Sequence, residues 1–524
     1  MTAIAAQPDF SDPSEQRRGS LPPLAVGVLI GLCAAKFLLH IFTSVRYYGY
    51  FRDELYYLDM ARHLDWGYVD AAPLVAVYAK IALVMGGSLA AVRILPVLAG
   101  AGLIAITVLI ARELGGGRYA QFLAGLSVLI CPAVLIAGSL MTNNSFEPVF
   151  WMGAILVVAR ILRTGDSRLW IWFGALTGLG LENKHSTLSF GFAVTVALLL
   201  THHRREFARP WIWIAGAVAV AIFLPNVIWQ IRHHFPTIED LVNVRREGKN
   251  VVLGPLAFVR EQILSVWPFL LPVWLAGLVW FLRDRRWRLL GLTFVVFFVL
   301  MEVAHGKSYY IFPIYPMVLA GGAVVIERAL ARWPAKRAAW VGAAVAIVIV
   351  LGTLPTFPLV LWFLPPERLL AYENTLGLKP AKAEVKHESL LPQPIADQFG
   401  WPEMVREIAS IYDSVPPDQR AETGIWASNY GEAGAVNLFG PRYGLPTAYS
   451  RHQNHWYWGP PPVVYKNLIV IQWSLDDVRD NCTSFQPFEH YERFGMGEEN
   501  APIYLCRGVK FDIEKIWWHS HHWN

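Results

Sequence analysis

Long apolar segments alternate with short polar loops over the first 362 residues of the chain. A segment of about 20 mostly apolar residues can cross the hydrocarbon core of a bilayer. Segments of this kind lie at eleven places: 21–43, 89–111, 118–138, 147–162, 169–183, 186–201, 210–230, 263–282, 288–304, 309–327 and 338–362. The pattern predicts an all-α polytopic membrane protein with about eleven transmembrane helices in residues 21–364.

The charges in the loops predict which side each loop faces. Short Arg-rich loops stay on the cytoplasmic side of a membrane. The loops "RILRTGDSR" (160–168) and "HHRREFAR" (202–209) are both Arg-rich, so two spans must lie between them. The same rule places 283–288 and 327–337 inside. The loops around residues 52–54, 141–148, 182–185, 231–262 and 305–310 are then expected outside, together with everything after residue 364.

The chain changes character after the last span. Residues 365–524 have Pro-rich stretches, more charge and only short apolar runs such as "NLIVIQW" (467–473), which is followed by the helix-compatible "SLDDVRDN". This alternation predicts a small soluble α/β domain on the outer side. Cys482 and Cys506 lie in it, and they either form a disulfide in an oxidising exterior or remain two buried thiols. The polar residues 1–20 are expected to be a disordered cytoplasmic tail.

Composition agrees with a membrane protein. Of the 524 residues, 55% are hydrophobic and only 16% are charged, against about a quarter charged in soluble domains. The 22 Trp and 20 Tyr fit a protein with membrane–water interfaces. We expect membrane lipids around the chain and no nucleic acid as partner.

Polar residues gather in the predicted outer loops, where they are costly near lipid unless they are paired or used. They are Arg52, Asp53, Glu54, Asp70, Asn143, Asn144, Glu147, Lys184, His185, Arg245, Arg246, His305, Lys307 and Tyr310. Carboxylates beside converging cations suit a group transfer from a lipid-linked phosphate, because a base can take a proton from an acceptor while cations stabilise the leaving phosphate.

The segment "DELYYLDMARHL" (53–64) has helical spacing, with Asp59, Arg62 and His63 on one polar face. We expect a helix that lies on the membrane surface, with Asp53 at its start. Asp53 is then either a general base or only a helix cap.

The segment "YYGYFRDELYYLDMARHLDWGYVDAAPL" resembles the first outer loop of the GT-C membrane glycosyltransferases. It is most similar to the bacterial family 39, ArnT-like group, which includes protein O-mannosyltransferases and the aminoarabinose transferase. "MTNNSFEPVFW" and "GKSYYIFPIYPMVLAGGAV" resemble later motifs of that group. The resemblance implies a GT-C fold in the bacterial inner membrane. It also implies a periplasmic active site and inverting sugar transfer from a polyprenyl-phosphate donor to an envelope glycolipid, polysaccharide or protein.

The resemblance also implies roles for single residues. Asp53 falls on the catalytic acidic position, and Glu54 on its acidic neighbour. Arg52, Lys184, His185, Arg245, Arg246, His305, Lys307 and Tyr310 are candidates for the donor phosphate. Asp70, Asn143, Asn144 and Glu147 are acceptor or auxiliary candidates. Asp70 and Glu147 are also possible ligands of a divalent metal ion.

Two other classes of function remain at this point. A lipid-linked sugar transporter or flippase would place ionisable groups near the middle of its spans. Here Lys36, Arg93 and Glu302 are expected near span ends, which favours chemistry at one face. In a non-catalytic envelope scaffold, "NHWYWGPPP" (454–462) would bind a partner; in an enzyme it could contact the acceptor glycan. The last residues, "HSHHWN", are expected to be a flexible polar tail or a metal site.

Overall fold

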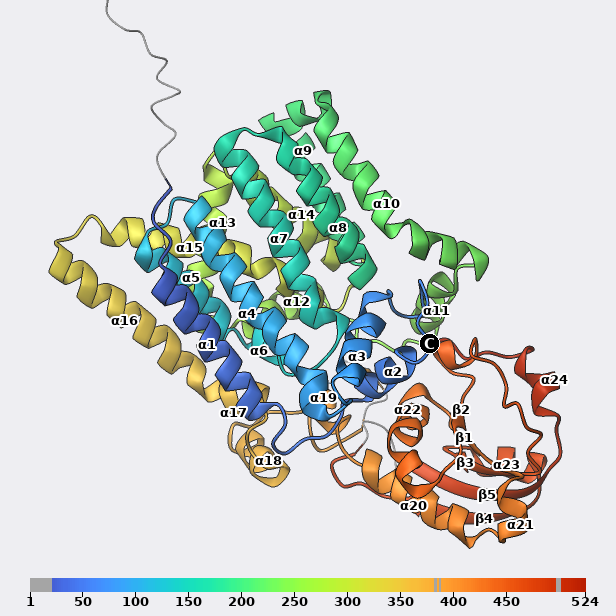
Figure 1. The fold of residues 1–524 in the computed structure, drawn as a ribbon. Helices are drawn as coiled ribbons and strands as arrows, with labels where there is room; N and C mark the ends of the chain where they lie inside the picture. Colours follow the sequence, from blue (N-terminus) through green and yellow to red (C-terminus); the bar gives the residue numbers. More distant parts are fainter. Residues whose placement is uncertain (1–20, 381–383, 386–387, 496–500) are drawn as a thin grey trace, which may run out of the picture.

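The computed structural model describes residues 21–380, 384–385, 388–495 and 501–524. The expected tail at 1–20 lies outside the described residues. Long helices form a bundle, and a smaller region with a sheet lies at one end of it (Figure 1). The bundle helices are α1 (Val26–Thr43), α4 (Leu89–Glu113), α5 (Arg118–Ile130), α6 (Pro132–Ala137), α7 (Asn143–Thr164), α8 (Trp170–Asn183), α9 (Thr187–Leu199), α10 (Pro210–Arg232), α12 (Pro255–Val266), α13 (Leu271–Arg283), α14 (Arg288–Val303), α15 (Tyr315–Leu330), α16 (Ala335–Thr353) and α17 (Phe357–Leu361).

The chain is a multi-pass membrane protein. Among the described residues, six helices are long and apolar enough to cross a membrane, or seven if α12 and α13, bent by 84°, count as one span. Helices occupy all eleven predicted segments, but α5, α8, α9 and α14 are shorter than 18 residues. The predicted span 118–138 is two helices, because Cys131 takes an extended conformation before Pro132.

Lys36 corrects one expectation. It does not lie near a span end but in the middle of α1, fully buried, where its Nζ donates to the carbonyl oxygen of Val134 at 3.1 Å. Its ammonium also lies 3.2 Å from the Nε2 atom of His40. A buried cation inside a span is therefore accommodated by packing and neutral acceptors.

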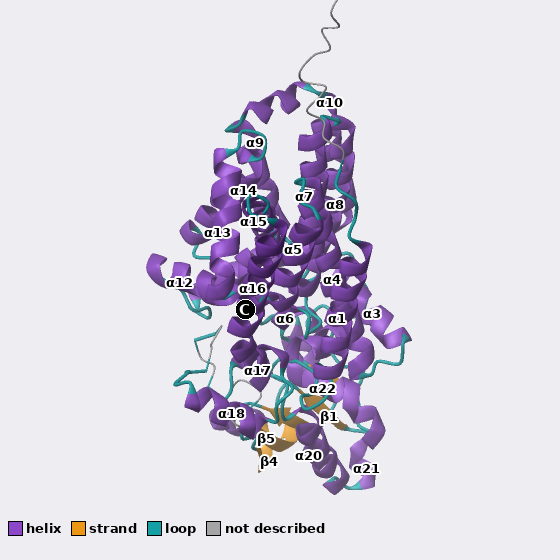
Figure 2. Cartoon of the chain, turned by 90° about the vertical axis from the view of Figure 1, so that its left-hand side faces the viewer, coloured by secondary structure: helices purple, strands orange, loops and turns teal. Residues whose placement is uncertain are grey.

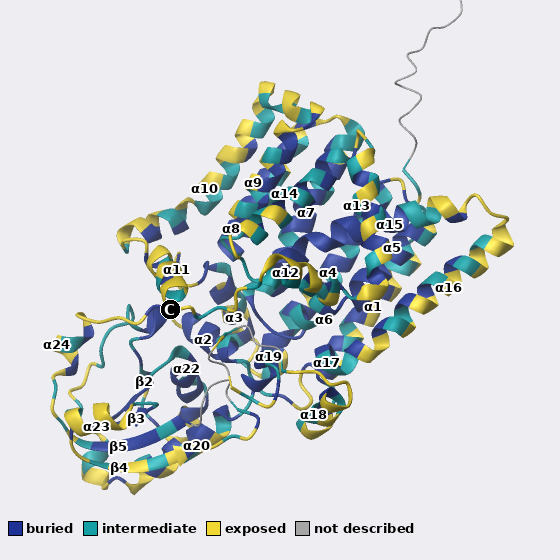
Figure 3. Cartoon of the chain, turned by 180° about the vertical axis from the view of Figure 1, so that it is seen from behind, coloured by how far each residue is buried: buried dark blue, intermediate teal, exposed yellow. Residues whose placement is uncertain are grey.

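Two short helices, α2 (Arg52–Met60) and α3 (Leu74–Val84), cover the end of the bundle that faces the sheet. The surface position expected for α2 is wrong. Eight of its nine residues are buried, because it is enclosed between the bundle and the C-terminal part of the chain (Figure 3).

We call residues 401–524 the C-terminal region. Its five-stranded sheet has the order β2-β1-β3-β5-β4. β2, β1 and β3 run parallel to one another, and β5 runs antiparallel to both of its neighbours, β3 and β4. The sheet lies beyond the end of the bundle (Figure 2). Its strands are β1 (Thr423–Trp426), β2 (Ala448–Tyr449), β3 (Asn467–Ile471), β4 (Cys482–His490) and β5 (Ala501–Val509). The expected strand at 467 and the helix after it are present, and Cys482 and Cys506 form a disulfide.

Shorter helices complete the fold. α11 (Pro236–Arg246) follows α10, and α18 and α19 lead into the C-terminal region. Their bounds, and those of the helices that flank the sheet, are α18 (Pro366–Thr375), α19 (Gln393–Ala396), α20 (Trp401–Ser414), α21 (Pro417–Arg420), α22 (Tyr430–Phe439), α23 (Leu475–Asn481) and α24 (Ile513–Trp517).

Glycines let α22 approach α2 closely. A Cβ on Gly431 would lie 2.6 Å from Cγ of Arg52, and one on Gly434 would lie 2.8 Å from the backbone of Leu55. Contacts this short do not occur with a real side chain, so both positions need glycine. The C-terminal region is thereby held directly against the helix that carries Asp53.

Candidate active site

Asp53 stands in the first turn of α2 but does not cap it. The capping carboxylate is that of Glu54, whose Oε2 accepts the backbone N–H of Phe51 at 2.9 Å. Asp53 instead accepts a hydrogen bond from the hydroxyl of Tyr430 at 3.0 Å. The structure therefore removes the cap as an explanation for Asp53.

Glu54, predicted to be catalytic with Asp53, is fully buried and bonded within the protein. Its two oxygens accept from Nε and Nη2 of Arg93 at 3.2 and 3.1 Å and from the backbone N–H of Met141 at 2.9 Å. The side chain has no exposed surface. Its bonds tie α2 to α4 and to the start of α7, so it positions its neighbour Asp53.

Tyr430 comes from the C-terminal region and was not predicted from the sequence. Its ring stacks on Tyr56 with centroids 4.7 Å apart and on His452 at 5.1 Å. The guanidinium of Arg52 lies 5.7 Å from the same ring. The one signal in the sequence is the pair of glycines after it, three residues apart on one helix face, which indicates close packing.

Arg52 does not stand free for a phosphate. Its Nη2 lies 3.3 Å from Glu384 and 3.7 Å from Asp397. Burial raises the pKa of Glu384, but the positive charges of Arg52, Lys249 and Lys307 outweigh it, so the pKa is lowered. Arg52, predicted to bind the donor phosphate, thus already lies beside two carboxylates.

Lys184 and Glu147 form a second cluster. The Nζ of Lys184 lies 2.7 Å from Oδ1 of Asn144 and 3.1 Å from Oε2 of Glu147, and it sits 4.3 Å from the ring centroid of Tyr310. Ser186 donates to the other oxygen of Glu147. The Nζ of Lys307 lies 6.0 Å from the ring of Tyr309. Two lysines from distant loops thus meet at a pair of tyrosines.

Four predicted phosphate residues lie elsewhere. His185 packs against Phe223 of α10, with ring centroids 5.7 Å apart. Arg245 and Arg246 are exposed in the last turn of α11, and His305 is exposed at the end of α14. The carbonyl oxygen of Asn143 accepts a hydrogen bond from Nδ2 of Asn183 at 2.9 Å.

Asp70 faces the same interior. Its Oδ1 accepts from the hydroxyl of Tyr56 at 3.1 Å. Surrounding protein, with the charges of Asp240 and Asp53, raises the pKa of Asp70 to about 7, although the side chain keeps solvent-accessible surface. Asp70 itself is exposed.

Asp53 has a raised pKa for similar reasons. Burial is the largest cause, and the Arg52 guanidinium, the Tyr430 hydrogen bond and the Lys307 charge oppose it. A carboxylate with a raised pKa is a stronger base than an exposed one once it is ionised. Asp53 is therefore suited to accept a proton.

The described residues contain no group of three or more His, Cys, Asp or Glu that could hold a metal ion. Asp70 and Glu147, the two candidate ligands, have different partners: Tyr56 for the first, and Lys184 with Ser186 for the second. The geometry gives no support to a metal shared between them.

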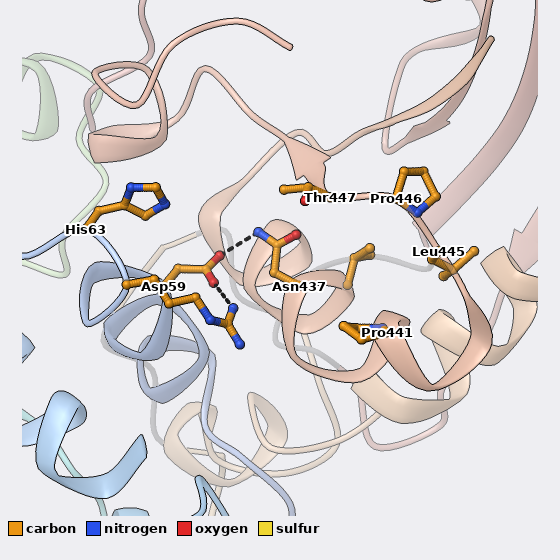
Figure 4. Close-up of a pocket in the computed structure, with 9 residues that line it drawn as sticks. Asp59, His63, Asn437, Pro441, Leu445, Pro446 and Thr447 are labelled. Carbon is orange, nitrogen blue, oxygen red and sulfur yellow. Dashed lines mark hydrogen bonds and ion pairs between the residues drawn. The ribbon is translucent and has the colours of Figure 1, made fainter. Parts of the chain in front are cut away.

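A pocket of about 340 Å³ opens between the end of α2 and α22 (Figure 4). Asp59 lies at its wall and accepts from Nδ2 of Asn437 at 2.7 Å and from Nη1 of Arg62 at 2.6 Å. Burial raises the pKa of Asp59 to about 6. His63, which also lines the pocket, stacks on Trp458 with ring centroids 4.4 Å apart.

The aromatic segment 454–462, which could contact a partner protein or an acceptor glycan, makes several of its contacts within the chain. Asn454 accepts the N–H of Val69 at 2.6 Å, and Tyr457 packs edge-on against Trp229 of α10 with ring centroids 5.8 Å apart. The final residues are not a loose tail. His521 lies 2.7 Å from Glu239, and the carbonyl oxygen of Trp523 accepts from Asn243 at 2.8 Å. Both segments fasten the C-terminal region to α10 and α11.

Comparison with known proteins adds independent information. Residues 70–229 match the family model described as dolichyl-phosphate-mannose-protein mannosyltransferase. The lipid A galacturonosyltransferase RgtD of Rhizobium johnstonii is 24% identical over 295 residues, which are 54% of this chain. The match spans 62% of that relative, less than two thirds of its length.

Two solved structures have a similar course of the chain. ArnT from Cupriavidus metallidurans bound to undecaprenyl phosphate has a TM-score of 0.60 at 14% identity, covering 92% of this chain and 98% of that one. The arabinofuranosyltransferase AftD from Mycobacteria has a TM-score of 0.54 at 13% identity, covering 94% of this chain and 41% of that one.

Proposed function

The chain has an ArnT-like GT-C fold, and on this premise we propose that it is an integral membrane glycosyltransferase. It transfers a sugar from a polyprenyl-phosphate donor to a hydroxyl of an envelope glycolipid, polysaccharide or protein. The reaction takes place at the periplasmic face of the bacterial inner membrane. Support comes from the relatives, which are named as glycosyltransferases, and from the ArnT structure, which holds undecaprenyl phosphate.

Asp53 is the general base in this proposal. Its carboxylate takes the proton of the acceptor hydroxyl while that oxygen attacks the anomeric carbon of the donor. The bond between this carbon and the phosphate oxygen breaks, and the polyprenyl phosphate leaves with the electron pair. Attack from the face opposite the phosphate inverts the anomeric centre. A base of this kind contributes about 10²–10⁴-fold to the rate.

Lys184 and Lys307 are the proposed phosphate ligands. The phosphate gains negative charge as it departs, so cations fixed near it stabilise the transition state. Glu147 and Asn144 hold the Nζ of Lys184, and Tyr309 and Tyr310 lie between the two lysines. Tyr310 can add a hydroxyl donor to the phosphate.

One observation carries the proposal: the Asp53 carboxylate has no task in capping its helix. It is instead partly accessible to solvent, accepts a hydrogen bond from Tyr430 and lies within the field of Lys307. A carboxylate needed only for folding would be expected to be fully buried and ion-paired, as Glu54 is with Arg93.

The test compares envelope glycans by mass spectrometry in a deletion strain complemented with wild type, Asp53→Asn or Asp65→Asn at matched protein levels. Asp65 lies in the same loop but accepts from Trp229 and from the Trp66 backbone. We expect one glycan mass to disappear on deletion, to return with wild type and Asp65→Asn, and to stay absent with Asp53→Asn.

Full restoration by Asp53→Asn would refute the catalytic role of Asp53 and favour a transporter or a scaffold. Purified protein then separates the classes: transfer from a synthetic polyprenyl-phosphate sugar to an acceptor in detergent, without any membrane to cross, is possible for a transferase and not for a flippase.

A further inference from the structure

A second polar site lies at the end of the bundle opposite Asp53. A cavity of about 760 Å³ opens where α7 and α9 end and where α13 turns into α14. Helix α7 connects the two ends: Asn144 in its first turn bonds Lys184, and Thr164 at its end lines this cavity. With 22 residues it is about 33 Å long, so the cavity is separate from the candidate active site.

The cavity wall is strongly basic. Four arginines and two histidines line it, and its lining contains no Asp or Glu: Arg163, Arg285, Arg286, Arg288, His202 and His203, with Leu162, Thr164, Gly165, Leu200 and Thr201 between them. Within the described residues, Arg163 alone of the four arginines forms an ion pair, with Glu113 at 2.5 Å. Three guanidinium groups therefore share one concave surface without a carboxylate partner there.

Backbone carbonyl groups hold these arginines in place. Arg286 donates from Nε to Leu162 at 3.2 Å and from Nη2 to Arg163 at 3.1 Å, and Arg288 donates from Nε to Leu282 at 2.9 Å. A carbonyl fixes the direction of a guanidinium but does not neutralise it. Burial and the charge of Arg163 lower the pKa of Arg286, against the effect of Asp284. Carbonyl groups thus fix the directions of Arg286 and Arg288, and Asp284 outside the lining offsets part of the charge of Arg286.

The cavity also borders an apolar surface. Leu200, one of its lining residues, is 64% exposed, and Leu199 beside it is 54% exposed. Trp213, near the start of α10, is also 64% exposed, which is typical of a residue at the membrane–water interface. An occupant therefore meets charge on one side and hydrocarbon on the other.

We propose that this cavity binds the phosphate headgroup of an anionic phospholipid from the leaflet on the side opposite Asp53. Arginine forks match phosphate oxygens bidentately. Basic pockets between transmembrane helices bind anionic headgroups in this way. The apolar rim at Leu199 and Leu200 receives the acyl chains, which distinguishes a lipid from a soluble phosphate.

The experiment measures retained lipid by native mass spectrometry of the purified full chain, after exchange into micelles with phosphatidylglycerol or phosphatidylcholine. We compare wild type, Arg285→Gln, Arg285→Gln/Arg288→Gln and the control Arg204→Gln/Arg205→Gln. Both control residues are exposed and lie outside the lining. The single variant covers the case that loss of the Arg288 bonds disturbs folding.

We expect one phosphatidylglycerol bound per chain, about tenfold or more weaker in the double variant, weaker in Arg285→Gln, and unchanged in the control. Phosphatidylcholine binding as tightly, or equal weakening in the control, would overturn the proposal. Inorganic phosphate and glycerol phosphate are added as competitors. Displacement of the lipid by either at equal concentration would overturn the lipid assignment and leave a site for a free anion.

Discussion

The two ends of the helical bundle use basic residues differently. At the Asp53 end, Arg52, Arg93 and Lys184 each form an ion pair with a carboxylate, and those partners are themselves largely buried. At the opposite end, which we call the arginine end, four guanidinium groups line a cavity without an acidic residue in its lining, and among the described residues three of them form no ion pair. Paired charges fix the geometry of a reaction site. Unpaired charges leave attraction available for a partner.

The largest effect should follow from breaking a paired charge. Arg93→Leu leaves the Glu54 carboxylate buried with only backbone donors. The substitution also removes the hydrogen bonds that Arg93 donates to the carbonyl oxygen of Gly49 and to Gln398. Removing one partner of a buried ion pair costs about 3–5 kcal/mol. We expect a correspondingly large fall in the thermal unfolding midpoint in detergent. A fall no larger than that of an exposed Arg substitution would contradict this view of the Asp53 end.

The next effect concerns the contact that completes that end. Gly434→Ala places a Cβ 2.8 Å from the backbone of Leu55, so α22 must move away from α2. Overpacking of this kind costs about 1–3 kcal/mol. We expect faster proteolysis of the C-terminal region and lower transferase activity. Gly216→Ala is the matched control, because a Cβ there meets nothing within 4 Å; equal sensitivity of both variants would speak against close docking.

A smaller change removes one hydroxyl. Tyr430→Phe deletes the hydrogen bond that helps to lower the pKa of Asp53, so this pKa should rise further. A base acts when ionised, and its activity grows as pH rises through its pKa. The acidic limb of the kcat/KM profile should therefore move to higher pH, with kcat retained at alkaline pH. An unchanged profile, or equal loss at every pH, would count against contact between Tyr430 and the base.

The smallest effect is expected at the arginine end. Arg285 is exposed, and surface substitutions usually change stability by less than about 0.5 kcal/mol. Arg285→Gln should leave the unfolding midpoint unchanged in neutral detergent and lower the extra stabilisation given by phosphatidylglycerol. Destabilisation in both conditions would show that this arginine supports the fold, and the contrast between the two ends would fail.

The membrane helices were predictable because their signal is local. An apolar run of sufficient length is complete within its own segment, so helices lie in all eleven expected segments, although among the described residues only six or seven are long enough to be spans. The breaks at Pro132 and Pro268 follow from the restriction that proline places on the residue before it. The position of α2 was missed because its aromatic face has the same pattern whether lipid or another domain covers it.

The candidate site was predictable only where a motif marked it. Asp53, Lys184 and Lys307 were named from outer loops, but the sequence does not show which of two neighbouring carboxylates, Asp53 or Glu54, forms the buried ion pair with Arg93. Tyr430 and Glu384 lie 377 and 332 residues from their partners Asp53 and Arg52. No local pattern encodes a contact over such a separation.

The docking of α22 on α2 also sets an order of assembly. Asp53 is made early in synthesis, whereas Tyr430 follows 377 residues later and can reach it only after the helices between them and the C-terminal region have folded. Until then Asp53 lacks its phenol partner. A partly made or wrongly folded chain therefore has an incomplete candidate site.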